Sequence, residues 1–321
     1  MAGGPSTPAL AAAVSDAGGL GFLAAGYKTA DKVAWEVAEV RKATSAPFGL
    51  NLFVVEPYEP AHEALESYRR SLEPEANRFG VRLGDPRWDD DEWRAKIDLV
   101  HDVRPDLVSF TFGCPDAQVL RRLSQSGVHS TVTVTTPAEA REAVERGAAS
   151  LCVQGPEAGG HRGRWKPDAM PDEIPLLDLL DAVVSEVDVP LVAAGGLTDA
   201  AGVEAVVRHG AVAGQAGTAY LLADEAGTHP VHRAALADPG FTRTEVTRAF
   251  TGRWARGLAN RFMADHRDAP AGYPQLQRLT APLRAAALAA GDAQAAQLWA
   301  GTGYAGIAGA PAGEITRSLA P

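Results

Sequence analysis

Short apolar runs rich in Val, Leu and Ala alternate with longer amphipathic runs along most of this chain. Such short runs are typical of parallel strands that are buried on both faces, and the longer runs predict helices. The predicted strands are residues 21–25, 48–53, 107–112, 129–135, 150–154, 190–194 and 211–219. The predicted helices are residues 9–17, 31–44, 138–146, 175–186 and 200–209. Repeated βα units indicate an α/β fold with a parallel sheet, either closed into a barrel or open and doubly wound.

The start of the chain lacks one strand of a complete barrel. Seven strands are predicted, whereas a (β/α)8 TIM barrel has eight. The opening segment Met1-Ala-Gly-Gly-Pro-Ser-Thr-Pro8 has the residues of a strand-to-helix turn, but no strand precedes it. We therefore predict a TIM barrel whose first strand is missing from this chain, and we expect the natural chain to start upstream. A disordered start is the alternative.

Two segments depart from the alternation, within what we predict to be a single domain of residues 1–321. Residues 54–104 form a helical insertion after the third strand of the barrel, counting the missing one, and are predicted to act as a lid. The acidic run Asp89-Asp-Asp-Glu92 is interpreted as the start of a helix, where carboxylates favourably meet the helix dipole. Residues 223–321 are predicted to form a helical annex. The arginines of residues 243–263 are interpreted as a solvated helix face, with a phosphate clamp as the alternative.

The composition argues against several classes of protein. The chain carries a formal net charge of −10, which argues against a nucleic acid or an anionic membrane as partner. No apolar stretch approaches the ~20 residues of a transmembrane helix, and the N-terminus lacks the pattern of a secretory signal. The two cysteines, Cys114 and Cys152, are too few for a disulfide framework and indicate reduced thiols in a cytoplasmic protein. No histidine pair has metal-ligand spacing, so no metal site is predicted.

Three of the predicted strands end in glycine-rich turns. The turns are Gln154-Gly-Pro-Glu-Ala-Gly-Gly-His161, Ala194-Gly-Gly196 and Gln215-Ala-Gly-Thr218. Glycine lets the backbone approach a flat or anionic ligand closely, and the loops after the last two strands of α/β barrels often hold a phosphate. The N–H groups of these last two turns, with the Thr218 hydroxyl, suit a phosphate dianion. Tight turns without a ligand are the alternative interpretation.

One histidine, His161, is placed at the mouth of this predicted phosphate site. Imidazole titrates near neutrality, as a general acid or base must, and a structural role is the alternative. No Gly-x-Ser-x-Gly elbow is present and neither cysteine has an evident base beside it, so nucleophilic catalysis is not indicated. A barrel with a phosphate site, close backbone approach and one acid–base histidine fits an FMN enzyme.

Taken in order, the motifs resemble those of the nitronate monooxygenase family. Besides the opening segment and the three turns, the resemblance includes Ala17-Gly-Gly-Leu-Gly21, Asn51-Leu-Phe53, Phe250-Thr-Gly-Arg253 and Leu298-Trp-Ala-Gly301. It covers nearly the whole chain. The resemblance implies an FMN-dependent TIM-barrel enzyme that oxidises alkyl nitronates with O₂ to carbonyl compounds and nitrite. A small-molecule nitronate and O₂ are then its partners.

The resemblance also implies the roles of individual residues. His161 is implied as the catalytic histidine, which binds the nitronate or deprotonates a nitroalkane. Contacts to FMN are implied for Asn51, Gln154, Gly159, Gly196, Gln215, Ala216, Gly217 and Thr218. The first alternative function is an FMN-dependent NAD(P)H reductase of quinones or enoyl thioesters on the same barrel. The second is a non-catalytic flavin-binding protein, or an inactive product that lacks the first strand.

Overall fold

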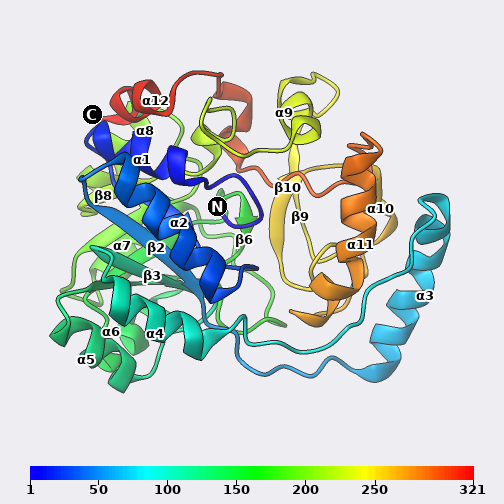
Figure 1. Cartoon of the computed structure of the whole chain (residues 1–321), viewed down its shortest axis with the longest axis horizontal. Helices are drawn as coiled ribbons and strands as arrows, with labels where there is room; N and C mark the ends of the chain where they lie inside the picture. The colour runs from blue at the N-terminus through cyan, green and yellow to red at the C-terminus, as the bar shows by residue number, and fades with distance from the viewer.

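Seven parallel strands form one curled sheet in the computed structural model, which describes residues 1–321. The strands are β1 (Gly21–Ala24), β2 (Phe48–Phe53), β3 (Leu107–Thr111), β4 (His129–Val134), β5 (Ser150–Gln154), β7 (Leu191–Ala194) and β8 (Ala213–Gln215). Each pairs with its neighbour in the order β1-β2-β3-β4-β5-β7-β8. All seven predicted strands are confirmed, and the fold is a barrel-like α/β sheet surrounded by helices (Figure 1). Because β1 and β8 are its two edges, the sheet has seven of the eight strands of a full barrel.

Helices follow the strands as the alternation predicts. They are α1 (Pro8–Asp16), α2 (Ala30–Ala43), α5 (Ala117–Gln125), α6 (Pro137–Arg146), α7 (Leu176–Val184) and α8 (Ala200–Arg208). Side-chain oxygens cap the first turns of five of them, because a short polar side chain can accept the unpaired N–H groups there. These capping residues are Thr7, Thr29, Asp116, Thr136 and Asp199. The five helices predicted from the sequence are confirmed, whereas α5 was not predicted.

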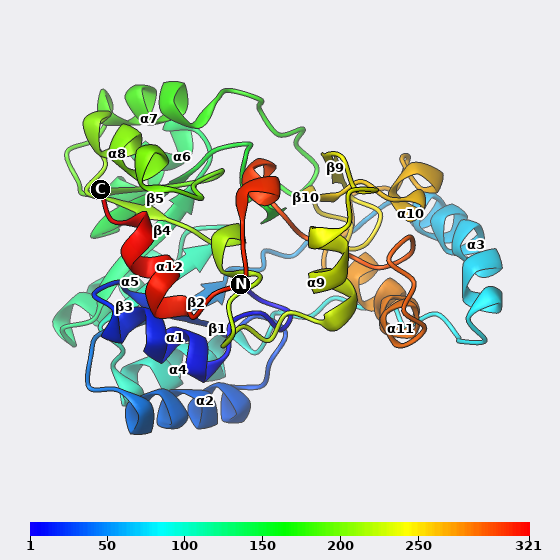
Figure 2. The ribbon, with the colours of Figure 1, turned by 90° about the horizontal axis from the view of Figure 1, so that it is seen from above.

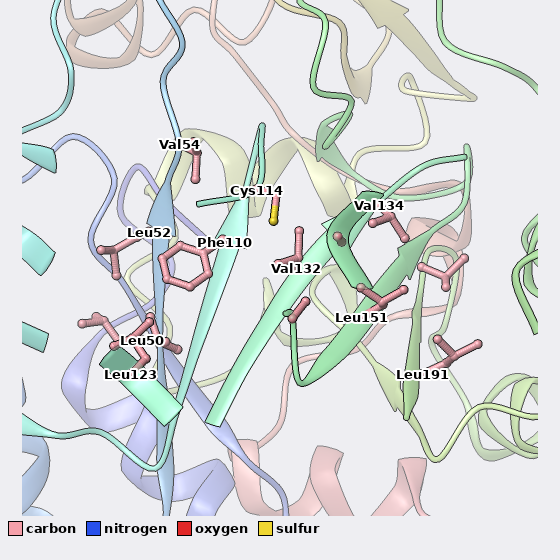
Figure 3. Packing of buried hydrophobic residues seen from close by; sticks show 14 of the residues in the cluster. Leu50, Leu52, Val54, Phe110, Cys114, Leu123, Val132, Val134, Leu151 and Leu191 are labelled. Carbon is pink, nitrogen blue, oxygen red and sulfur yellow. The ribbon is translucent and has the colours of Figure 1, made fainter. Parts of the chain in front are cut away.

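The main core lies between the sheet and the helices that surround it. Leu50, Phe110, Val132, Leu151 and Leu191 come from five neighbouring strands and belong to one buried apolar cluster (Figure 3). Strands buried in this way need apolar residues at nearly every position. The Val- and Leu-rich runs of the sequence therefore fix the sheet and bring the polar strand ends to one face.

The insertion contains two helices, α3 (His62–Arg78) and α4 (Trp93–Val103). Helix α3, which was not predicted, buries Tyr68 and Leu72 in the same apolar cluster as Phe250 of the annex. It lies on the far side of α11 (Gln275–Ala289) from the sheet (Figure 2). No residue of the insertion lines the cavity described below. The apolar face of α3 packs on the annex, and the role of the insertion as a lid stays a prediction.

The acidic run leads directly into α4, and its carboxylates also bind groups outside that helix. The Glu92 carboxylate accepts a hydrogen bond from the N–H of Ala30 at 2.8 Å, at the start of α2. Asp91 accepts from the N–H of Tyr27 at 2.9 Å and forms an ion pair of 2.7 Å with the buried Lys96. The run thus stands directly before the start of α4, as predicted, and has further partners outside that helix. Its carboxylates tie the insertion to the segment between β1 and α2.

The annex combines helices with a small antiparallel sheet that the sequence did not predict. Its remaining helices are α9 (Pro230–Ala237), α10 (Arg261–Asp265) and α12 (Ala312–Leu319). Its strands β9 (Thr244–Thr247) and β10 (Ala255–Leu258) join β6 (Gly160–His161) in the order β6-β10-β9. Arg253 lies between β9 and β10 and is only 4% exposed, so its interpretation as part of a solvated helix face is wrong. None of the helices combines the length and apolarity that crossing a bilayer requires.

Candidate active site

A cavity of about 550 Å³ opens at the carboxyl ends of the strands, a size typical of small-molecule sites. The ends of β2, β3, β5, β7 and β8 line one side, and α11 with Trp299 lines the other. Eight of the nine predicted site residues line it, namely His161, Asn51, Gln154, Gly159, Gly196, Gln215, Gly217 and Thr218. Ala216 does not, because it packs against an apolar cluster of α1 and α12.

Two of the predicted glycines are required by the shape of this cavity. A Cβ atom on Gly159 would lie 2.4 Å from the backbone nitrogen of Gly301, so no side chain fits between these two segments. Gly196 has a φ of +71°, in the left-handed region that favours glycine. The glycines therefore let three backbone segments meet at the floor of the cavity.

One end of the cavity presents unpaired hydrogen-bond donors. The N–H groups of Gly196 and Gly217 donate no hydrogen bond within the protein. The Thr218 hydroxyl accepts from the N–H of Gly301 at 2.9 Å, so its own proton remains available to a ligand. Donors that converge in this way suit an anionic group such as a phosphate. The residues present thus fit the phosphate of a nucleotide cofactor.

Asn51 is held in place by its neighbours on β3. Its Nδ2 donates to the Ser109 hydroxyl at 2.8 Å and to the Thr111 hydroxyl at 3.0 Å. Its Oδ1 makes no hydrogen bond within the protein, and Asn51 lines the cavity. An acceptor in this position suits an N–H group at the edge of a heterocyclic ring.

Gln154 has a structural task in addition to any contact with a ligand. Its Oε1 accepts from the N–H of Gly163 at 2.7 Å, and its Nε2 donates to the carbonyl oxygen of His161 at 3.0 Å. The amide therefore fixes the segment that carries His161 to the end of β5. One N–H of the amide remains free to contact a cofactor.

Aromatic rings surround the His161 imidazole. The ring centroids of Phe112 and Trp299 lie 5.6 Å from it, and that of Tyr273 lies 6.0 Å away. Phe112 has a φ of +79°, which is rare for a bulky residue and concentrates at functional sites. The Arg253 guanidinium lies 4.1 Å from the Phe112 ring centroid, at the distance of a cation–π contact.

The imidazole is neutral in this environment. Burial, with the positive charges of Arg253 and Arg284 adding to it, lowers the pKa of His161 to about 3. Arg284 on α11 is also buried, and it donates to Thr280 at 3.1 Å and to Gln297 at 2.6 Å. A neutral imidazole has a lone pair that can accept a proton, although this lowered pKa makes it a weaker base than a free imidazole.

The sequence indicated only some of these residues. Arg253 and Trp299 lie in motifs that carry the resemblance, but no role followed from their pattern. Tyr273 and Arg284 were not singled out, and the annex brings Tyr273 to the His161 ring and Arg284 to the cavity, more than a hundred residues after His161. Their positions depend on the packing of the annex, which no local motif records.

The two cysteines do not belong to this group of site residues. Both thiols are free and buried. Burial raises the pKa of Cys114 and that of Cys152 to about 12 each. A thiol that stays protonated is a poor nucleophile, so these residues support the interpretation of structural cysteines.

Comparison with known proteins decides the family. The family model described as nitronate monooxygenase matches residues 1–321. The chain belongs to the nitronate monooxygenase family. It is similar to the nitronate monooxygenase of Pseudomonas aeruginosa, with 39% identity over 98% of this chain and 92% of that protein. The family consists of flavin-dependent oxidoreductases, and this chain is an enzyme of that class.

Solved structures support the same assignment. The nitroalkane oxidase from Streptomyces ansochromogenes is 48% identical, with a TM-score of 0.96 over 99% of this chain and 92% of that chain. FabK from Thermotoga maritima is 26% identical, with a TM-score of 0.76 over 99% of this chain and 89% of that chain. The similarity thus extends over the barrel and the annex of this family member.

A second buried histidine makes the stability of this family member sensitive to acid. His232 on α9 is 7% exposed, and burial lowers its pKa to about 4. In the unfolded chain its pKa is ~6.5. Between these two values the unfolded state binds a proton that the folded state does not, so folding stability falls as the pH falls. His161 acts in the same direction.

We therefore expect His232→Asn to lose less stability on acidification than the parent protein. Between pH 7.5 and 5 the difference should be about 1–3 kcal/mol, since asparagine takes up no proton. Urea denaturation at the two pH values measures it. His62→Asn, at an exposed histidine, is the control and should follow the parent. An identical loss in His232→Asn and the parent would contradict a neutral, buried His232.

Proposed function

We propose that this enzyme oxidises alkyl nitronates with O₂ to carbonyl compounds and nitrite, with FMN as its cofactor. One observation carries the proposal. Arg284 is the only charged side chain that lines the cavity, and no carboxylate lines it. Met1 also lines the cavity, but its N-terminal amine donates to the Ser6 hydroxyl at 2.7 Å, and burial lowers the pKa of that amine to about 5. A site with a single positive charge beside a neutral His161 suits a small anion such as a nitronate.

The relatives support this substrate class. The Pseudomonas aeruginosa protein is named a nitronate monooxygenase, and the Streptomyces ansochromogenes protein is a nitroalkane oxidase. A nitronate is the anion that remains when a nitroalkane loses the proton on the carbon beside its nitro group. Both names therefore describe the same reacting atoms in two protonation states. We extend both to the substrates of this chain.

The residues at the floor of the cavity fit FMN. Gly196, Gly217 and Thr218 offer the donors for its phosphate, and Asn51 Oδ1 offers an acceptor for its ring edge. When bound, FMN supplies the acceptor for the electrons of the substrate and passes them to O₂. The glycine turns permit the close backbone approach that a flat ring needs.

The chain itself contributes binding and proton transfer. Arg284 attracts the anionic substrate, and the rings of Phe112, Tyr273 and Trp299 keep water away from the imidazole. For a neutral nitroalkane, His161 accepts the proton from the carbon that carries the nitro group. A nitronate has already lost that proton, so His161 then serves only to bind and orient it.

Anaerobic mixing tests this function. The purified protein should be yellow, with a releasable FMN, and ethylnitronate should bleach it far faster than NADH does. In air, ethylnitronate should drive O₂ uptake with the release of nitrite. Rapid bleaching by NADH and none by the nitronate would instead establish the reductase alternative. Bound FMN that neither compound reduces would establish the non-catalytic one.

The Thr218 hydroxyl offers a test of the phosphate position. Thr218→Val removes both the donor to the phosphate and the acceptor for the Gly301 N–H. FMN binding should weaken by about 1–3 kcal/mol, the cost of losing a hydrogen bond to a charged group. Equilibrium dialysis or fluorescence titration measures the Kd. Thr218→Ser keeps the hydroxyl and should bind FMN as the parent does, whereas equal affinity in all three proteins would place the phosphate elsewhere.

His161→Asn separates proton abstraction from anion binding. Asparagine keeps a polar group but takes up no proton at neutral pH. We expect kcat/KM for neutral nitroethane to fall by about 10²–10⁴-fold, the usual contribution of a general base. The kcat/KM for ethylnitronate should fall less, and FMN content should stay the same. Equal losses for the two substrates would show that His161 acts only in binding.

A further inference from the structure

The His161 ring is hydrogen-bonded to the side chain of Thr251. Its Oγ1 lies 2.9 Å from His161 Nε2. Thr251 precedes β10 and is 1% exposed, and it does not line the cavity. It belongs to the motif Phe250-Thr-Gly-Arg253, to which the proposed function gives no role. Thr251 can therefore affect the reaction only through its hydrogen bond to the imidazole.

The direction of this hydrogen bond follows from the number of protons available. The Thr251 hydroxyl has one proton and two lone pairs. Its oxygen lies 3.2 Å from the carbonyl oxygen of Arg253, and the N–H of Arg253 donates back to it at 3.4 Å. No other group donates to that carbonyl oxygen in the structure. If the hydroxyl gave its proton to His161, this carbonyl in a residue only 4% exposed would lose its partner, which costs free energy.

The hydroxyl proton therefore belongs to the Arg253 carbonyl, and the remaining lone pair accepts from His161. The imidazole is neutral, so it carries a single N–H, and that N–H is at Nε2. The lone pair is then on Nδ1. Nδ1 has no hydrogen-bond partner in the protein and remains accessible from the cavity that the ring lines.

We propose that Thr251 is a positioning residue that holds His161 in its Nε2–H tautomer, so that Nδ1 is the atom that takes the substrate proton. The role in proton transfer rests on the proposed function, whereas the tautomer does not. The second partner of a functional histidine commonly sets which ring nitrogen carries the proton. Here that partner is a hydroxyl whose other hydrogen bonds lie within its own turn.

The proposed step is a simple proton transfer. The C–H bond beside the nitro group breaks, its electron pair stays on the substrate as the nitronate, and the proton goes to Nδ1. The imidazolium that forms lies near the cations Arg253 and Arg284 and beside the Tyr273 ring. It therefore depends on the newly formed nitronate for a negative charge. A base that becomes cationic here returns its proton readily.

Nitrogen NMR of the histidine side chains tests the tautomer without any reaction. Protein with ¹⁵N-labelled histidine, as purified with its cofactor, gives different shifts and couplings for a protonated and an unprotonated ring nitrogen. The His161 signals are those missing from His161→Asn. The proposal expects a protonated Nε2 and an unprotonated Nδ1 from pH 6 to 8. A protonated Nδ1 in the parent protein would overturn it.

Variants of Thr251 add a kinetic measurement. Thr251→Val keeps the shape of the side chain and removes the hydroxyl, and Thr251→Ser keeps the hydroxyl. In Thr251→Val the NMR pattern should become a mixture of tautomers. The kcat/KM for nitroethane should fall about 10–100-fold, as when the outer partner of a functional histidine is lost. The kcat/KM for ethylnitronate should stay near that of the parent, and Thr251→Ser should restore both measurements.

The outcomes separate this proposal from the proposed function. A purely structural role would lower the activity with both substrates together and leave the tautomer unchanged, which would overturn the positioning role. A pure Nε2–H tautomer in a folded Thr251→Val would do the same. A parent protein that oxidises neither substrate, but shows the Nε2–H tautomer that becomes mixed in Thr251→Val, would refute the function and support the assignment of Thr251.

Discussion

The pairing of the two-residue strand β6 with β10 is the interaction on which the site depends. His161 lies opposite Ala255 in this pairing, so the annex holds its backbone from one side. The Gln154 amide holds the same backbone from the barrel, through the carbonyl oxygen of His161 and the N–H of Gly163. The imidazole can then move only by rotation about its own side-chain bonds. Fixing the backbone on both sides is how a site reaches the sub-ångström placement that proton transfer requires.

The charges around the imidazole explain why a histidine suits this place. A carboxylate beside Arg253 and Arg284 would form ion pairs that neutralise their charges, whereas burial and the same two charges keep the imidazole neutral and lower its pKa. A neutral imidazole forms no such pair. The Arg253 cation is stabilised by the ring faces of Phe112 and Tyr273 and by the carbonyl oxygen of Arg164. The positive field therefore attracts an anion to the cavity without consuming the base.

The parts of the structure that local patterns encode could be predicted from the sequence. The seven strands follow from apolar runs, and the turns that contain Gly159, Gly196 and Gly217 follow from glycine after a strand. Parallel strands bring their carboxyl ends to one face, so the turns converge without further information. The tasks of single side chains were harder to predict. Gln154, which the resemblance assigns to FMN, also serves as a clamp on β6.

The rest depends on contacts between distant parts of the chain. Tyr68 donates to the carbonyl oxygen of Ala249, 181 positions away, and this contact holds α3 on the annex. Thr251 reaches His161 across 90 positions. No short window of sequence contains both members of such a pair. The barrel thus presents the turns and the imidazole, and the annex supplies nearly every group that touches the ring. Differences in annex packing can therefore change the environment of the base while the barrel motifs stay the same.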